Sequence, residues 1–208
     1  MQTHLNHAIF NLVFEGKPIM RPESRRVKMT KKLLCDSLIH FLFQKDIQHV
    51  TIKEICNYAD INRSTYYRYY QDPFDQLNKI QEELLHELNL HIEKLVNNID
   101  SSLQSASSDY TSSMVEYLEY VQSQRDIIQI LLSVFPDNQF LITFVSHIQA
   151  NLLTLSPVTN NSSRLYDFIF ASSGCIGLLV HWLTNDPEMS VNDLAKLMVS
   201  YTILFTIE

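Results

Sequence analysis

A short segment rich in arginine, hydroxyl and tyrosine side chains suits the recognition of nucleic acid. Arg63 and Arg68 can each donate two hydrogen bonds to guanine O6 and N7. The hydroxyls of Ser64 and Thr65 can bond a base or a phosphate. The phenol of Tyr67 can bond a phosphate oxygen while its ring packs on the sugar. Together these side chains favour a surface that enters the major groove.

A first short helix is expected just before this segment. Thr51-x-x-Glu54 is a capping box, in which the side chain of each residue accepts a hydrogen bond from the backbone N–H of the other. A helix is therefore expected to begin at Thr51. Apolar residues follow at helical spacing and form one buried face. They are Ile52, Ile55, Cys56 and Ala59.

A tight turn and a second short helix follow. The turn is Asp60-Ile61-Asn62, because Asp and Asn tolerate left-handed backbone and bond their own main chain. Residues 63–70 form the second helix, with Tyr66 and Tyr70 on the core side because they are four residues apart. Its outer side carries the polar residues that would face a nucleic acid.

This stretch resembles the N-terminal domain of TetR/AcrR-type transcriptional regulators. The family pattern has a Thr at the head of the second helix, a turn, a small polar residue, a late Tyr in the recognition helix and a closing aromatic. The matching residues are Thr51, Asp60-Ile61-Asn62, Tyr67, Tyr69 and Tyr70, followed by Asp72 and Leu77. The resemblance is strong over roughly residues 28–80 and only architectural beyond them. There are two departures: Asp60 replaces the turn glycine, and Pro73 replaces a Lys that would bind phosphate.

The resemblance implies an all-α protein with an N-terminal three-helix helix-turn-helix DNA-binding domain and a C-terminal helical dimerisation and effector domain. It implies that Thr51 caps its helix against a phosphate. A basic segment ahead of the first helix would lie near the DNA backbone or minor groove, although a solvated terminus explains it equally well. The expected DNA-binding residues are Thr51, Arg63, Ser64, Thr65, Tyr67, Arg68, Tyr69, Arg25, Arg26 and Lys28.

The charge distribution agrees with a DNA-binding head, although the net charge of −7 by itself argues against one. Residues 21–72 hold ten Lys or Arg against six Asp or Glu, a net charge of +4. Residues 73–208 hold five against sixteen, a net charge of −11. A basic head on an acidic body would orient itself toward a polyanion.

We expect three regions along the chain. Residues 1–20 form an extension that lacks the features of a secretory signal. Residues 21–80 form the DNA-binding domain, with the helix-turn-helix at about 51–70. Residues 81–208 form the helical dimerisation domain, which begins with a long helix capped by Asp72 and opened by Pro73.

The helix expected at 164–184 is apolar nearly all round, so it should be buried on every side. In the resembling family the last two long helices of each subunit form a four-helix dimer interface. A dimer also places two recognition helices about 34 Å apart in successive major grooves. The expected interface residues are Phe170, Gly174, Gly177, Leu178, Trp182, Leu197, Tyr201 and Leu204.

Catalytic and metal-binding patterns do not stand out. The sequence holds no Gly-rich phosphate loop, nucleophile elbow or HExxH motif, and His86 and His91 are wrongly spaced for one helix face. We therefore expect no enzyme activity, no cofactor and no metal. Three scattered cysteines indicate buried thiols in a reducing cytoplasm, and no apolar run reaches membrane-spanning length.

The sequence therefore predicts a cytoplasmic homodimeric repressor that binds a palindromic DNA operator. Its affinity would be controlled by a small-molecule effector or partner protein in the C-terminal domain, at a ligand site that we cannot assign. An alternative is a co-regulator that binds DNA weakly and acts through a partner protein. A helical enzyme is a third class, which would need a catalytic constellation.

Overall fold

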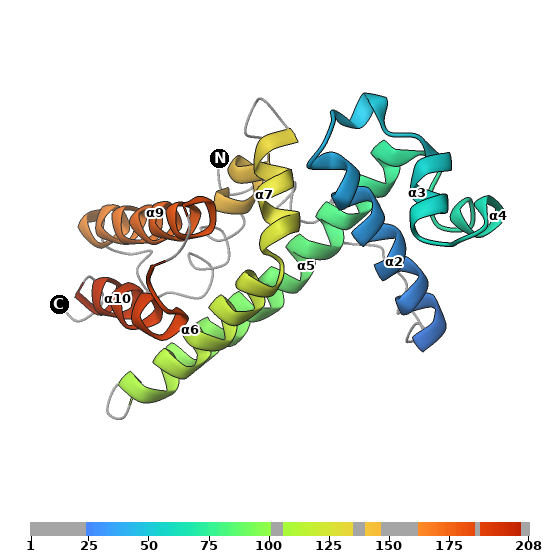
Figure 1. Cartoon of the computed structure of the whole chain (residues 1–208). Coiled ribbons are helices and arrows are strands. Elements are labelled where there is room, and N and C mark those ends of the chain that lie inside the picture. Colours follow the sequence, from blue (N-terminus) through green and yellow to red (C-terminus); the bar gives the residue numbers. More distant parts are fainter. Residues whose placement is uncertain (1–23, 101–105, 135–139, 147–161, 186–187, 205–208) are drawn as a thin grey trace. The chain divides into compact units, whose positions relative to one another are not determined.

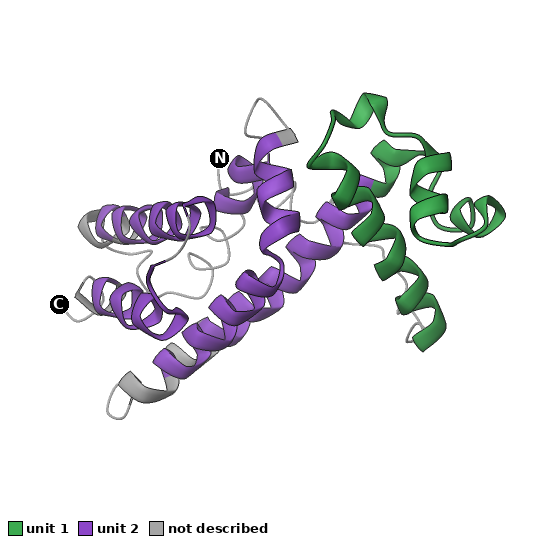
Figure 2. Ribbon diagram, viewed as in Figure 1, with its two compact units in different colours: residues 1–76 green, residues 77–208 purple. Residues whose placement is uncertain are grey.

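We analysed a computed structural model of the chain, which describes residues 24–100, 106–134, 140–146, 162–185 and 188–204 (Figure 1). These residues are helical wherever they form regular structure. The helices are α2 (Arg25–Leu42), η1 (Ile47–His49), α3 (Ile52–Tyr58), α4 (Arg63–Tyr66), α5 (Pro73–Asp100), α6 (Ala106–Ser123), α7 (Arg125–Val134), α9 (Ser162–Thr184) and α10 (Val191–Leu204). The chain divides into two compact units, residues 1–76 and 77–208 (Figure 2).

Unit 1 is held together by a fully buried apolar core and two buried polar ties. Leu34, Ile55 and Tyr66 have no exposed surface, and they join α2, α3 and α4. The hydroxyl of Ser37 donates to the Ile55 carbonyl at 2.9 Å, and Gln76 Nε2 donates to the Leu34 carbonyl at 2.8 Å. These bonds give partners to the buried Ser37 hydroxyl and the Gln76 Nε2 group, so they fix how α2 meets α3 and the first turn of α5.

The turn between α3 and α4 forms as expected at Asp60. Asp60 has a φ of 52°, in the left-handed region, and is the one non-glycine residue with positive φ in the described chain. The Ile61 N–H donates to the Cys56 carbonyl at 2.9 Å, and the Asp60 N–H to the Asn57 carbonyl at 3.4 Å. This pair of bonds is a Schellman motif, which ends α3 and reverses the chain toward α4.

Two helices of unit 1 are shorter than their sequence patterns predict. The second short helix was expected over 63–70, but α4 spans Arg63–Tyr66 and residues 67–69 form turns. The N–H groups of Arg68 and Tyr69 bond carbonyls three residues back, so the winding continues in a tighter form. The apolar stripe of Leu34, Leu38, Phe41 and Leu42 predicts a first helix that runs to about Lys45, whereas α2 ends at Leu42. The predicted capping box of α3 and the Asp72 cap of α5 are confirmed.

Unit 2 packs its helices through apolar faces. Helix α10 packs on α6 and α9, and α7 packs on α9. Leu118, Val121 and Leu131 are completely buried. Two side chains of α7, Arg125 and Gln129, both donate to the Leu183 carbonyl near the end of α9, at 3.0 and 2.7 Å. These bonds fasten α7 to α9.

The expectation that the helix at 164–184 is buried on every side is wrong for the single chain. Tyr166 is 71% exposed and Phe170 is 72% exposed, and Gly174 and Gly177 are also exposed. These positions form one stripe because they recur every three or four residues. The opposite face, which includes Leu179, is buried. The apolar composition of α9 therefore leaves a stripe that its own unit does not cover.

Other differences concern the ends of segments. The serine-rich composition of residues 101–108 predicts a linker, whereas residues from Ala106 onward belong to α6. Helical spacing of apolar residues predicts a helix over 139–155, of which residues 140–146 are described and are helical. Proline and asparagine predict breaks at Pro136 and within 156–161, which lie outside the described residues. None of the described helices is long and apolar enough to cross a membrane.

Candidate nucleic-acid interface

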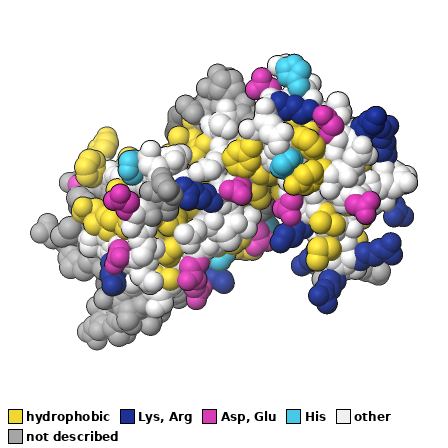
Figure 3. All heavy atoms as spheres, in the orientation of Figure 1, with side chains coloured by type: hydrophobic (Ala, Val, Ile, Leu, Met, Phe, Trp, Pro, Cys, Tyr) yellow, Lys and Arg dark blue, Asp and Glu magenta, His cyan; other side chains and the backbone are white. Residues whose placement is uncertain are grey.

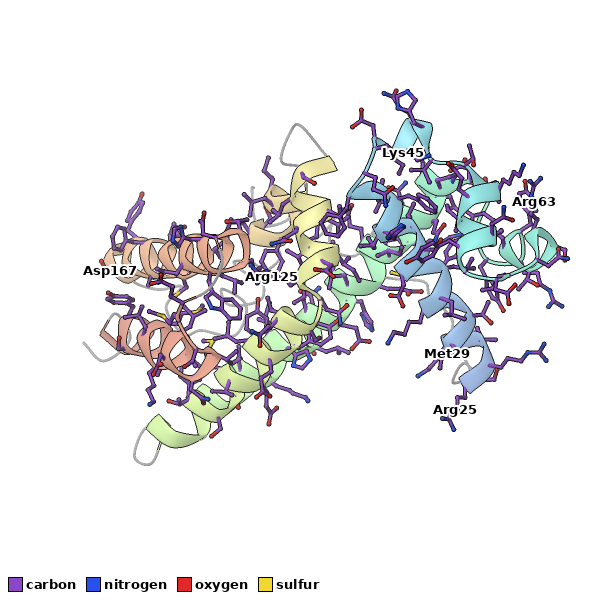
Figure 4. All side chains as sticks on the ribbon, in the orientation of Figure 1. Arg25, Met29, Lys45, Arg63, Arg125 and Asp167 are labelled. Carbon is purple, nitrogen blue, oxygen red and sulfur yellow. The ribbon has the colours of Figure 1, made fainter. Side chains whose placement is uncertain are left out.

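The outer face of α4 is polar because its apolar side chains turn into the core. Tyr66 is completely buried, and burial raises the pKa of its phenol well above the usual range, with a smaller effect of Asp72 in the same direction. Arg63 and Ser64 are exposed, and Tyr67 is 60% exposed. Arg63 lies at the outer edge of unit 1 (Figure 4). The face can therefore present hydrogen-bonding groups to a ligand.

The other residues expected on this face lie as follows. Arg68 is exposed, whereas Thr65 and Tyr69 are half-buried. The rings of Tyr69 and Tyr70 are 6.3 Å apart, and Tyr70 belongs to the core. Tyr69 therefore offers only part of its side chain to a ligand.

Thr51 lies at the start of α3 and is exposed, but its hydroxyl is occupied. It accepts from the Glu54 N–H at 3.3 Å and donates to Glu54 Oε2 at 2.7 Å. Glu54 also accepts from the Thr51 N–H at 3.0 Å and from Lys45 Nζ at 2.7 Å. Lys45 thereby links the chain after α2 to the first turn of α3. The bonds from Lys45 and Thr51 lower the pKa of Glu54 to about 2.

Asn62, expected only as a turn residue, also caps α4. Its side-chain oxygen accepts from both the backbone N–H and the hydroxyl of Ser64, at 2.9 and 3.0 Å. The sequence signal for this cap is an Asn directly before the first helical residue. Asn62 is exposed, so part of its amide faces solvent.

The basic segment was expected ahead of the first helix, but it forms the exposed beginning of α2. Arg25, Arg26 and Lys28 all lie in its first turn or beside it, after the Ser24 cap. Lys and Arg side chains stand out over several parts of unit 1 on the face that Figure 3 shows. This first turn holds no acidic residue. Its charge therefore suits a polyanion.

Residues expected at a dimer interface lie on α9 and α10. Phe170 and Tyr201 are exposed, at 72% and 43%, and Leu178 and Leu197 are half-buried. The Leu204 side chain lies outside the described residues. Trp182 is 5% exposed, and its indole N–H donates to the Met189 carbonyl at 2.9 Å. Trp182 therefore packs inside its own chain and supports the segment between α9 and α10.

Unit 2 also contains an apolar recess. Its lining comes from α5, α6, α7, α9 and the 140–146 helix, and includes Leu88, Val121, Ile128, Phe140, Phe144 and Leu179. Among the described residues no group of three or more His, Cys, Asp or Glu could hold a metal ion. Nearby, His91 stacks on Tyr120 with ring centres 4.6 Å apart. The described residues that line the recess are all apolar.

Comparison with known proteins finds a family match for the C-terminal region and a solved structure of similar fold. Residues 108–203 match a family model described as a transcriptional regulator C-terminal region, TetR_C_8. The structure resembles that of a TetR transcriptional regulator from Streptococcus agalactiae 2603V, with a TM-score of 0.52 and 23% identity over 86% of this chain and 96% of the other.

The amino-acid sequence is also similar to that of a curated protein. It is an uncharacterized HTH-type transcriptional regulator, YxbF, of Bacillus subtilis (strain 168), 23% identical over 172 residues. The match covers 81% of this chain and 42% of the relative, so the chain spans less than half of that protein's length.

Proposed function

Because the chain belongs to the TetR family of transcriptional regulators, we propose that it is a repressor that binds a palindromic DNA operator as a homodimer. The observation that carries the proposal is the exposed polar face of α4, with Arg63, Ser64 and Tyr67 outward and Tyr66 buried. Such a face can enter the major groove while the core holds its orientation.

The contacts are assigned by chemistry. Arg63 is exposed, and its planar guanidinium can donate two hydrogen bonds to guanine O6 and N7, so it is assigned to a guanine. Tyr67 and Arg68 are assigned to phosphates, which position the head without carrying sequence information. Thr65 and Tyr69 add contacts at the edge of this face. Thr51 is assigned to holding the first turn of α3 through Glu54, whose carboxylate takes both of its donors. Arg25, Arg26 and Lys28 are assigned to the adjacent backbone or minor groove.

The exposed stripe of α9 supports a homodimer. Phe170 is large, apolar and exposed, and Gly174 and Gly177 leave room beside it. A Cβ atom added to either glycine would meet nothing within 4 Å, so packing inside the chain does not require glycine there. Small residues beside an exposed aromatic allow a second helix to approach closely. We assign Leu178, Leu197, Tyr201 and Leu204 to the same interface.

Effector control is assigned to unit 2. A small molecule or partner protein that binds there would shift α5, the helix that begins at Pro73 in unit 1 and continues through unit 2. The effector must bind the two spacings of the DNA-binding heads with different affinity, because only a difference in affinity can move the equilibrium. The apolar recess around Leu88 and Phe144 is the candidate site.

A second function, that of a co-regulator with weak DNA binding, is favoured by one feature. Pro73 is buried where a phosphate-binding Lys was expected, and Asp72 beside it is exposed. Measuring DNA affinity against salt concentration separates the two functions. A repressor with several phosphate contacts loses roughly 10³–10⁵-fold in affinity between 50 and 200 mM salt. A flat salt dependence, or no binding at low salt, would instead support the co-regulator.

A further inference from the structure

Two neighbouring side chains at the beginning of α4 act as one hydrogen-bonding unit. The side-chain oxygen of Asn62 accepts from the Ser64 N–H at 2.9 Å and from the Ser64 hydroxyl at 3.0 Å. Both residues are exposed on the polar side of α4. Once these two bonds are made, each side chain has only part of its hydrogen-bonding capacity left for a ligand.

The Ser64 backbone settles the orientation of the Asn62 amide. A backbone N–H can only donate, so the atom that it meets must be the amide oxygen and not the NH₂ group. The same oxygen can only accept, so the Ser64 hydroxyl gives its proton to Asn62. Both lone pairs of the Asn62 oxygen are then used. What remains is the NH₂ donor of Asn62 and the acceptor lone pairs of Ser64 Oγ.

These two remaining groups match one base edge in the major groove. Adenine presents the N7 acceptor next to the N6 donor, whereas guanine presents two acceptors, N7 and O6. An isolated Asn reads adenine with its own oxygen and nitrogen. Here Ser64 replaces the oxygen, which is occupied. Guanine would place O6 against the lone pairs of Ser64 Oγ and is therefore disfavoured.

We propose that Asn62 and Ser64 together read one adenine in each half of the operator, with Asn62 donating to N7 and Ser64 accepting from the N6 amino group. The inference rests on the proposed function, since it names the base that the DNA-binding face selects. It separates the role of this pair from that of Arg63, whose five donors suit guanine.

The first experiment selects binding sequences from a pool of DNA duplexes with a randomised central segment. The wild-type chain is compared with Asn62→Ser, which keeps an oxygen to cap α4 but removes the NH₂ donor, and with Ser64→Ala. Asn57→Ser makes the same change at an exposed position of α3 and serves as the control. We expect both test variants to lose the preference for one adenine per half-site and to keep the other positions, whereas the control matches the wild type.

The second experiment places base analogues at that adenine. The analogue 7-deazaadenine lacks N7, and purine lacks the N6 amino group. Wild-type affinity should fall by roughly 5- to 100-fold with either analogue. Asn62→Ser should be insensitive to 7-deazaadenine, and Ser64→Ala should be insensitive to purine. Thermal unfolding of each variant checks that the head remains folded.

The outcomes separate the adenine assignment from the proposed function. If the wild-type chain enriches a palindrome and both variants keep the same adenine preference, the assignment of Asn62 and Ser64 is overturned and the proposed function stands. If both variants respond to the analogues as the wild type does, the assignment is overturned as well. If the wild-type chain enriches no sequence, both the proposed function and the adenine assignment are overturned.

Discussion

The two helices α4 and α9 leave opposite kinds of side chain exposed. On α4 the exposed groups are Arg63 and Ser64, which form directed hydrogen bonds, and the large aromatic Tyr66 is buried. On α9 two large and largely apolar side chains, Tyr166 and Phe170, are 71% and 72% exposed. The exposed face of α4 therefore suits a polar, charged ligand, whereas the exposed aromatic stripe of α9 suits another apolar protein surface.

The net charges of the two regions also indicate that DNA binds the region that carries α4. The segment that carries α4 has a net charge of +4, and the remainder from residue 73 onward has a net charge of −11. A DNA ligand would be attracted to the first and repelled by the second. Each of the following predictions changes one side of this contrast, beginning with the largest expected effect.

Phe170→Glu should break the homodimer. The substitution places an unpaired carboxylate in the proposed interface from each subunit, at a cost on the order of 3–5 kcal/mol. Sedimentation should show a monomer at concentrations where the wild type is a dimer, and operator affinity should fall by on the order of 100-fold. Phe43→Glu, an equally drastic change at a 55% exposed position of unit 1, should leave the oligomeric state unchanged. A dimeric Phe170→Glu protein would remove α9 from the interface.

Arg63→Ala should reduce sequence preference by about 1–3 kcal/mol, because it removes a two-bond contact with guanine. Arg63→Lys keeps the charge but not the planar fork, so it should retain affinity for unrelated DNA and still lose preference. Titrations against the selected duplex and a scrambled duplex measure both quantities. An unchanged ratio of the two affinities in Arg63→Ala would exclude Arg63 from base recognition.

Glu54→Gln should remove a pH-dependent part of the stability of unit 1. The pKa of Glu54 is about 2 in the folded chain against an ordinary value of 4.5, because Lys45 and Thr51 bond its carboxylate. The folded value is depressed, so this stabilisation is present above about pH 4.5 and is lost as the pH falls toward 2. Urea unfolding should show the advantage of the wild type over Glu54→Gln shrinking across that range.

Lys45→Met supplies the control for this pH effect. It removes the partner that contributes most to the low pKa of Glu54. The pH dependence attributed to Glu54 should therefore be smaller in the Lys45→Met background. If Glu54→Gln changes stability equally at all pH values, the carboxylate does not contribute in the way described.

The smallest effect is expected for Tyr66→Phe. The Tyr66 hydroxyl is buried and has no hydrogen-bond partner among the described residues. Its removal should leave stability unchanged or raise it by up to about 1 kcal/mol. Tyr117→Phe provides the matched test in unit 2, since that hydroxyl is in the same situation. Denaturant unfolding of both variants measures the change, and a loss of about 1 kcal/mol would show that the hydroxyl is bonded.

Sequence patterns predict what is determined locally. The Thr51–Glu54 capping box, the left-handed Asp60 and the Asp72 cap all depend on residues within four positions of one another, and all three are present. The TetR-like fold follows from the same stretch. The exposed or buried state of residues 63, 66 and 67 also follows from helical spacing.

Features that depend on distant residues could not be predicted. Gln76 is buried because it bonds a carbonyl 42 residues earlier, which no local pattern records. Phe170 was expected to be buried because α9 is apolar, but composition does not show which face the other helices of its own chain cover. The coupling of Asn62 to Ser64 is local, yet an Asn before a helix predicts only the cap and not the use of the hydroxyl.

The most direct test of the central claim is a binding titration of the protein against a palindrome from the randomised pool and against its scrambled sequence, at several salt concentrations. We predict that the selected duplex binds at least roughly 10³-fold more tightly at physiological salt, with half-sites one helical turn apart or a multiple of it. Equal affinity for both duplexes, or no binding at low salt, would contradict the claim that α4 reads DNA sequence.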